Sequence, residues 1–530
     1  MKLAGFLKSL ISCRNKEKLI VSFFFLFFFI IGLFIYKDYG IYWDEQANRW
    51  HGLKAARFFL QGNQRYFQEQ SRCDSAVFEL FLAFIEIFFG LTGGSQSAFF
   101  MRHLVTFILF FISTFFFYLL SKKQFLDWKT ALLGPLFLFL SPRIFANSFY
   151  NSIDISFLAV FIIAVFTLIN FLEKKNWRIA FFHSFVCAVL IDIRIIGVII
   201  PFLTLLFFAI DLLTVDRREN KIKLISCFLI YTFFLIILTI FFWPVLWENP
   251  WQNFWFTFKK MAHYPWKEKV LYFGNYFRAD NLPWHYILVS MMTTTPIIYI
   301  FLFFIGIICF SKQIIRNSAE CYFKYKNELI FFTWFFFPLF MVIFLKSVLY
   351  DSWRHLFFVY PAFLLFSLKG LVFINQFIKT KFSGLTFRYI KRFFLLIIGF
   401  SLINIGCLMI RYHPFQYVYF NKLIGRDFKK AKQNFDLDYW GLSYKQALGY
   451  ILDNDSKKQI KIYVINSPGK DNAAILEADK RIRLAYVEEP GQADYFLSNF
   501  RGHQEDYPYQ QEFYSVKING AIIMIVYKLK

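Results

Sequence analysis

Long runs of apolar residues recur along this chain and constrain its fold more than any other feature. The first is "LIVSFFFLFFFIIGLFIY" at residues 19–36. A helix of about 18 apolar residues can cross the roughly 30 Å hydrocarbon core of a bilayer. Such runs predict eleven spans, near residues 19–36, 99–120, 130–146, 153–172, 179–193, 195–213, 224–246, 286–310, 329–346, 356–373 and 393–411. The fold class predicted is therefore an α-helical polytopic membrane protein.

The net charge of +24 has two interpretations, a nucleic-acid partner or a membrane protein with basic cytoplasmic loops. The position of the charge favours the second, because Lys and Arg concentrate in alternate links between the predicted spans. These links are "SKKQFLDWK", "EKKNWR", "DRRENKIK", "SKQIIRNSAECYFKYKNE" and "INQFIKTKFSGLTFRYIKR". With the basic N-terminus in the cytoplasm and an odd number of spans, the C-terminus is predicted to lie outside. No nucleic-acid partner is expected.

The last part of the chain, residues 412–530, is polar and carries short alternating runs such as "IKIYVIN". Its final run reads as a hairpin that turns at Asn519-Gly520. We predict two domains: a transmembrane domain over residues 1–411, with outer loops 37–98 and 247–285, and a small α/β periplasmic domain over 412–530.

Two carboxylates follow the first span directly, in "KDYGIYWDEQANRW". Asp44 and Glu45 have a structural interpretation, since an Asp can cap a following helix and a Glu suits its positive end. Asp154, at the outer start of the fourth span, has the same alternative. An ionisable group at the hydrocarbon edge is costly, however, and usually faces a partner or a cavity.

Basic residues occupy other outer turns at the same predicted membrane depth. They are Arg143, Arg194, Arg354 and His355. Each could snorkel to the lipid headgroups, but together with the carboxylates they suit one reaction. Glycosyl transfer from a lipid-linked phosphate donor needs a base for the acceptor and cations for the departing phosphate.

Four pieces resemble the GT-C superfamily of membrane glycosyltransferases, in the branch of protein O-mannosyltransferases and the lipid A aminoarabinose transferase (glycosyltransferase family 39). They are "YWDEQANRW", "SPRIFANSFYNSIDISFLA", "LPWHYILVSMMTTTP" and "YDSWRHLFFVYPAF", in this order. The resemblance implies a bacterial inner-membrane enzyme that takes a sugar from a polyprenyl-phosphate donor, with inversion, and builds cell-envelope glycan.

The resemblance also implies roles for individual residues. Asp44, Glu45 and Asp154 would be catalytic, and Arg143, Arg194, Arg354 and His355 would bind the donor phosphate. The matching pieces further place Trp43, Asn151, His285 and Tyr286 at a donor or acceptor pocket. Some relatives hold a divalent cation with acidic residues, so Asp44 with Asp154 could bind one, although no His or Cys metal cluster is visible and no cofactor is expected.

Two other classes remain open at this point. A transporter or lipid flippase would be expected to show internal repeats and broken helices near mid-membrane, and no clear repeat is present. A non-catalytic assembly partner would have a degenerate site, against which Asp44, Asp154, Arg143 and Arg354 argue. The soluble module is C-terminal here, whereas protein mannosyltransferases carry a different one in a loop, so the acceptor stays open among glycan, lipid and protein.

Overall fold

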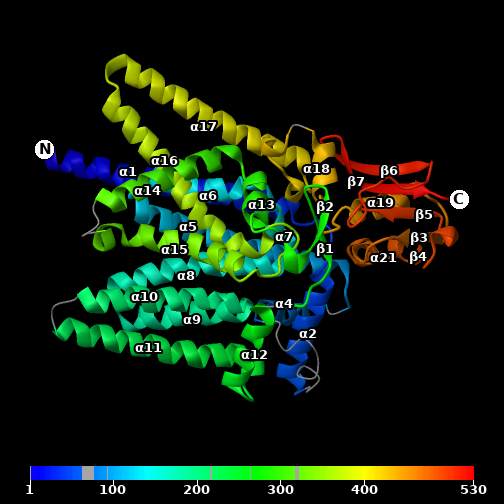
Figure 1. Cartoon of the computed structure of the whole chain (residues 1–530), viewed down its shortest axis with the longest axis horizontal. Helices are drawn as coiled ribbons and strands as arrows, with labels where there is room; N and C mark the ends of the chain where they lie inside the picture. Colours follow the sequence, from blue (N-terminus) through cyan, green and yellow to red (C-terminus); the bar gives the residue numbers. More distant parts are fainter. Residues whose placement is uncertain are drawn as a thin grey trace.

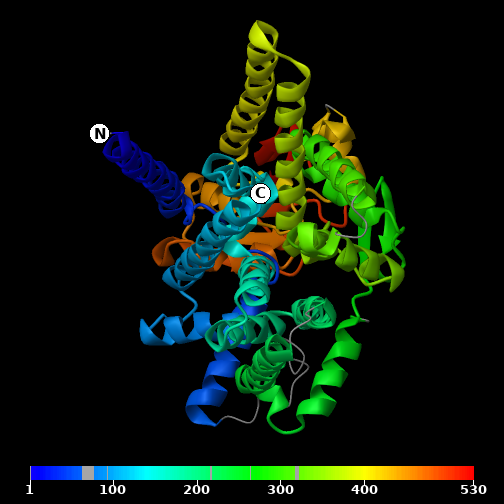
Figure 2. The ribbon, with the colours of Figure 1, turned by 90° about the vertical axis from the view of Figure 1, so that its left-hand side faces the viewer.

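The computed structural model describes residues 2–62, 77–91, 93–214, 218–262, 264–316, 321–425 and 427–530, without the side chains of residues 2–15, 218–220 and 321. Within these ranges, nine helices are long and apolar enough to span a bilayer. They are α1 (Lys2–Ile35), α5 (Gln96–Phe125), α8 (Ser152–Lys174), α10 (Ile199–Thr214) together with the preceding 3₁₀ turn η2 (Ile195–Val198), α11 (Arg218–Phe242), α14 (Ile297–Arg316), α15 (Cys321–Phe344), α16 (Tyr360–Lys381) and α17 (Gly384–Tyr412). They form a bundle in which α1 and α17 lie at the periphery (Figures 1 and 2). The prediction of a polytopic helical membrane protein is confirmed.

The third predicted span, 130–146, is not one straight helix. It divides into α6 (Trp128–Phe139) and α7 (Pro142–Tyr150), which are bent by 67° at the break between them. Pro142 stands at the first position of α7, where its missing N–H and fixed φ favour the start of a helix. Every residue of α7 is buried, so this piece turns into the protein.

Two other predicted spans also differ from the expectation. The segment 286–310 is interrupted between α13 (Tyr286–Thr294) and α14, because Thr295 is extended before Pro296. Helix α9 (Trp177–Ile193) has only 17 residues, about 25 Å, yet it packs against α8 and α11 inside the bundle. All eleven predicted segments are thus helical, and nine of them contain an uninterrupted candidate span.

The two predicted outer loops fold into short elements at one end of the bundle. The first contains α2 (Glu45–Gln61) and α4 (Val77–Phe88), which pack together. The second contains α12 (Pro250–Ala262) and a hairpin of β1 (Lys269–Tyr272) and β2 (Asn275–Arg278). The expected membrane-interface position of the second loop fits α12, where Trp251 is 79% exposed.

The C-terminal part forms a five-stranded mixed sheet in the order β4-β3-β5-β7-β6. Its strands are β3 (Ile460–Val464), β4 (Leu484–Tyr486), β5 (Tyr495–Ser498), β6 (Glu512–Ile518) and β7 (Ala521–Lys528), and its helices are α18 (Phe428–Asn434), α19 (Tyr444–Asn454), α20 (Pro468–Asp471) and α21 (Ala478–Arg481). The predicted hairpin turn is present, since Asn519 and Gly520 both have positive φ, as a type I′ turn requires.

The sheet is fixed firmly to one end of the bundle, which we call the sheet-bearing end (Figure 1). Apolar residues from Phe415 to Leu442, with Ile518, Ala521 and Ile523 of the β6–β7 hairpin, pack into the same hydrophobic core as the membrane helices. Helix α19 and the rest of the sheet have a core of their own. Asn472 bonds both backbone groups of Ile41, and Trp440 donates to Asn147. These contacts hold the C-terminal domain against the sheet-bearing end of the bundle.

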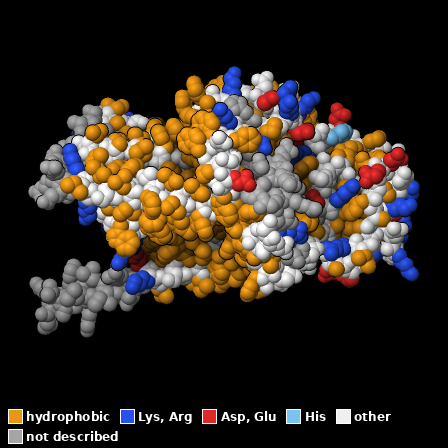
Figure 3. All heavy atoms as spheres, turned by 90° about the horizontal axis from the view of Figure 1, so that it is seen from below, with side chains coloured by type: hydrophobic (Ala, Val, Ile, Leu, Met, Phe, Trp, Pro, Cys, Tyr) orange, Lys and Arg blue, Asp and Glu red, His pale blue; other side chains and the backbone are white. Residues whose placement is uncertain are grey.

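The helical surface is mainly hydrophobic, and charged side chains gather around the sheet (Figure 3). The basic links α5–α6, α8–α9 and α16–α17 lie at the opposite end (Figure 1). By the positive-inside rule we expect that end in the cytoplasm.

A reporter that is active only outside the cytoplasm, fused after Lys530, should therefore be active, and its cytoplasmic counterpart at the same position should be silent. Both reporters should show the reverse pattern when fused within the α8–α9 link. Activity of the cytoplasmic reporter after Lys530 would overturn the orientation.

Candidate active site

Asp44 precedes α2 but does not cap it. It occupies the N-cap position, yet its carboxylate accepts no hydrogen bond from the helix N–H groups. Its Oδ2 lies 3.5 Å from Nη2 of Arg354, and the side chain is 42% exposed. The Asp44 side chain therefore does not act as a helix cap. Its carboxylate pairs with Arg354 and is partly exposed to solvent.

Asp154 is held by its own helix start. Asn151 is the N-cap of α8, accepts a hydrogen bond from the Asp154 N–H, and donates through Nδ2 to Asp154 Oδ2 at 2.8 Å. The N-cap of α8 is therefore Asn151. Both carboxylate oxygens of Asp154 also form ion pairs. Oδ1 pairs with Arg194, and Oδ2 lies 3.3 Å from Nη1 of Arg354.

Arg354 joins these carboxylates. Besides Asp44 and Asp154 it reaches Asp351, whose Oδ2 lies 3.4 Å from its Nε. Its guanidinium lies over the rings of Tyr350 and Trp440, at 4.6 and 4.7 Å from their centroids. The fork geometry of Arg suits such multiple pairing, and the rings fix its plane.

We call Asp44, Asp154, Arg194, Asp351 and Arg354 the ion-pair cluster. Its members come from four separate parts of the chain: the first predicted outer loop, α8, the turn after α9, and the turn that leads from α15 into the 3₁₀ helix η6 (Arg354–Val359). Burial raises the pKa of Asp44, while Arg354 opposes that rise. The cluster combines a partly exposed carboxylate of raised proton affinity with two guanidiniums, which suits proton acceptance beside an anion.

Asp351 and Arg501 extend the cluster towards the sheet. Asp351 and Ser352 both have positive φ, a conformation that non-glycine residues rarely adopt. The Ser352 N–H is held by the Tyr286 hydroxyl at 3.0 Å, and Asp351 Oδ1 lies 2.9 Å from Nη2 of Arg501. Arg501 also lies 4.3 Å above the ring of Trp43, which places the predicted pocket residue Trp43 at this junction.

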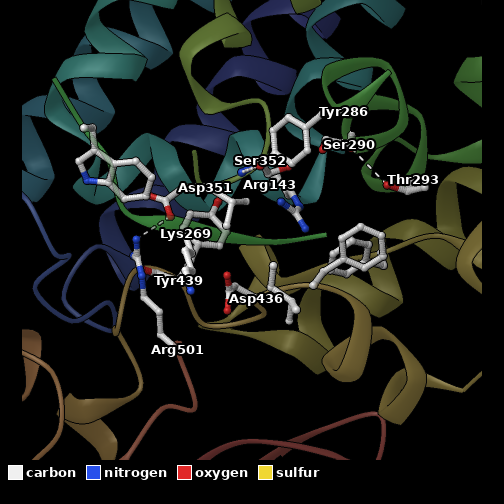
Figure 4. Close-up of a pocket in the computed structure, with 15 residues that line it drawn as sticks. Arg143, Lys269, Tyr286, Ser290, Thr293, Asp351, Ser352, Asp436, Tyr439 and Arg501 are labelled. Atoms are coloured by element: carbon white, nitrogen blue, oxygen red, sulfur yellow. Dashed lines mark hydrogen bonds and ion pairs between the residues drawn. The ribbon is translucent and has the colours of Figure 1, made fainter. Parts of the chain in front are cut away.

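A cleft opens beside Asp351 (Figure 4). Its charged lining residues are Arg143, Lys269, Asp351, Asp436 and Arg501, and Tyr286, Phe420, Phe435 and Tyr439 add aromatic walls. We call it the Arg143 cleft. Burial raises the pKa of Asp436 to about 6, although Arg501 acts in the opposite direction.

The remaining predicted residues lie outside the ion-pair cluster. Arg143 faces the cleft, with its Nε donating to the Tyr419 carbonyl at 3.1 Å. His355 packs against Tyr350, and His285 bonds the Tyr272 hydroxyl through Nδ1 at 2.6 Å. His285 makes no described contact with the ion-pair cluster, whereas His355 lies within electrostatic reach of Arg194 and Arg354.

Glu45 belongs to a second buried network. One of its oxygens lies 3.2 Å from His103 Nε2, and it also accepts from the Tyr42 N–H. Close by, Arg102 pairs with Glu79 and Glu86, and Arg49 pairs with Glu86. This network ties α2 and α4 to α5, so the adjacent carboxylates Asp44 and Glu45 have different surroundings.

A divalent cation does not fit between Asp44 and Asp154 in this arrangement. Arg354 already pairs with both carboxylates, and the described residues contain no group of three His, Cys, Asp or Glu side chains that could hold a metal.

The sequence does not reveal Arg501, Asp436 or Lys269. Arg501 lies in "SNFRGH" of the soluble domain, with no motif around it, and reaches the site only because the sheet docks on the bundle. Asp351 was visible in "YDSWRHL", three residues before Arg354, and that i,i+3 spacing was a usable signal.

The fold and the site together describe a multi-pass membrane protein with the ion-pair cluster at the sheet-bearing end of its helix bundle. No protein-family model and no curated protein matches the sequence. Among solved structures, the chain is similar to ArnT from Cupriavidus metallidurans. The apo form shows 11% identity and the undecaprenyl phosphate-bound form 12%, each with a TM-score of 0.49 over 96% of this chain and 98% of the other. The likeness concerns the fold alone.

Proposed function

We propose that the protein is an integral-membrane glycosyltransferase that moves a sugar from a polyprenyl-phosphate donor to an acceptor on the periplasmic side, with inversion. The observation that carries this proposal is the ion-pair cluster at the sheet-bearing end of the bundle. There, Arg354 lies 3.5 Å from the partly exposed Asp44 and 3.3 Å from the buried Asp154. The motif resemblance supports the same reading.

The chemistry follows from the two kinds of charge. The acceptor hydroxyl oxygen attacks the anomeric carbon, Asp44 takes the hydroxyl proton, and the bond from that carbon to the phosphate oxygen breaks. Arg194 and Arg354 stabilise the negative charge that the polyprenyl phosphate gains as it leaves. A single displacement of this kind inverts the anomeric configuration.

The position of the cluster suits a donor that is dissolved in the membrane. A lipid tail must stay in the bilayer while its phosphate reaches the site, and the acceptor must approach from water. A site at this end of the bundle meets both needs, and this accounts for the position of Asp44 shortly after the first span. The proposed location is the bacterial inner membrane.

The test is a transfer assay with the full-length protein in lipid nanodiscs. The labelled polyprenyl-phosphate sugars of the source cells serve as donors, and membrane extracts serve as acceptors. We expect transfer of label with release of polyprenyl phosphate. The absence of transfer from every donor in the pool, with a folded protein, would contradict the proposal.

The proposal also predicts the pH dependence of this reaction. A base acts when deprotonated, and burial raises the pKa of Asp44 above its ordinary value of about 3.9. Turnover should therefore fall as the pH falls through that raised pKa. Arg501 lowers the pKa of Asp44, so Arg501→Gln should move the acid limb of the profile to higher pH. Arg278→Gln, at the exposed Arg278–Asp280 pair, should leave the limb in place.

A further inference from the structure

Arg143 is a buried cation that forms no ion pair with a carboxylate in the described part of the chain. Its side chain is 2% exposed, and no carboxylate in the described part of the chain lies within 4 Å of it. Its Nε is used by the Tyr419 carbonyl, and its guanidinium lies 4.6 Å from the centroid of Phe420. Burying an unpaired charge is costly unless a partner supplies the missing interactions.

The guanidinium faces the Arg143 cleft, where an outside partner could reach it (Figure 4). Lys269 is the first residue of β1, is exposed, and also lines the cleft. Arg501 is already paired with Asp351, so it adds no free positive charge. The cleft therefore offers one buried cation at its base and one exposed cation on its lining.

The other walls suit a sugar ring. Tyr286, Phe420, Phe435 and Tyr439 line the cleft with aromatic faces, and Ser290, Ser352 and Asp436 add groups that can form hydrogen bonds with hydroxyls. Aromatic walls with a few placed polar groups are the usual make-up of a small-molecule site. The cleft shares Asp351 with the ion-pair cluster, so a sugar bound here would lie beside the proposed reaction centre.

We propose that the Arg143 cleft binds a sugar that carries a carboxylate, with the carboxylate held by the terminal nitrogens of Arg143. This inference rests on the proposed function, because it names the substrate class of the same site. Binding can be measured without turnover, so the two proposals can fail separately.

The charges in the cleft favour a single negative charge over a phosphate. One buried guanidinium balances one carboxylate, and its two terminal nitrogens match the two carboxylate oxygens. A phosphate monoester would bring nearly two negative charges to the same guanidinium, close to the carboxylates of Asp351 and Asp436. A monoanionic sugar fits this balance better.

The experiment measures binding of glucuronate, glucose and glucose 6-phosphate to the full-length protein in nanodiscs by calorimetry. We expect saturable binding of glucuronate and weaker binding of glucose. Glucose 6-phosphate should bind no more tightly than glucose. Arg143→Gln should weaken glucuronate binding about 10- to 100-fold, as expected for the loss of charge-assisted hydrogen bonds. The control Arg278→Gln changes an exposed ion pair on the β1–β2 hairpin, which also carries Lys269, and should bind glucuronate as the unchanged protein does.

Arg143→Gln should also leave the melting temperature unchanged or higher, because it removes a buried charge that forms no ion pair with a carboxylate in the described part of the chain. If that variant fails to fold, Lys269→Glu is the second test, since it reverses a charge at an exposed position of the cleft lining. It should weaken glucuronate binding and leave glucose binding unchanged. Equal binding of glucuronate and glucose, preference for glucose 6-phosphate, or glucuronate binding that survives both substitutions would overturn the carboxylate assignment.

Discussion

Asp44→Asn should lower turnover at least about 100-fold, the range typical for loss of a general base, while the protein folds normally. Asn has nearly the same size as Asp and can form similar hydrogen bonds. It cannot, however, take the proton from the hydroxyl of the acceptor. The backbone gives no reason for instability, because the Asp44 side chain makes no capping bond to α2. The measurement is the initial rate of sugar transfer, together with the melting temperature of the variant.

Asp38→Asn is the matched control. Asp38 lies in the same outer segment and also pairs with a basic side chain, His413, at 2.7 Å. It makes no described contact with the ion-pair cluster, so its variant should keep turnover. Glu45→Gln should instead lower the melting temperature, because Glu45 lies in the buried network with His103. Near-normal turnover in Asp44→Asn would remove Asp44 from the chemistry.

Arg354→Lys should lower turnover by roughly 100-fold, comparable with the loss of one preorganised donor to a developing anion. The guanidinium of Arg354 reaches Asp44, Asp154 and Asp351 at once from between two rings. A lysine keeps the charge but presents it at one point, so it cannot keep all three partners and the donor phosphate.

The control for this variant is Arg278→Lys, at an exposed pair outside the cluster, which should be silent. Both rates should be compared at matched protein stability, since the buried ion pairs also hold the turn after α15. A variant Arg354→Lys with normal turnover would show that the fork geometry is not needed, and the role of Arg354 as a phosphate clamp would then fail.

Hydropathy alone predicted the helical segments well, because a bilayer core requires long apolar helices with internally satisfied backbones. It could not show the 67° bend between α6 and α7 or the break before Pro296. Both breaks involve a proline inside an apolar run. The hydrophobic signal continues across such a proline while the backbone changes direction.

The site was predictable where a charged residue lay near the outer end of an apolar run. Asp44, Asp154, Arg194 and Arg354 were singled out for that reason, and the structure brings them together. Arg143 satisfied the same criterion, yet the bend before α7 aims it into the neighbouring cleft. Membrane depth can be read from a sequence, but the direction of a side chain around the helix axis depends on packing.

Arg501 is a site residue that the sequence alone did not predict. It comes from a polar domain in which many charged residues lie on the surface, and only docking of the sheet on the bundle places it against Asp351 and Trp43. The C-terminal domain therefore contributes to the proposed site, and neither the eleven apolar runs nor the motifs after the first span predict this contribution.

The central claim is that the ion-pair cluster receives the phosphate of a polyprenyl-phosphate donor. Its most direct test is an experimental structure of the full-length protein in nanodiscs with polyprenyl phosphate added. We expect density for the phosphate within about 3 Å of Arg194 or Arg354, facing Asp44. A well-defined phosphate elsewhere, with the ion-pair cluster empty, would contradict the account.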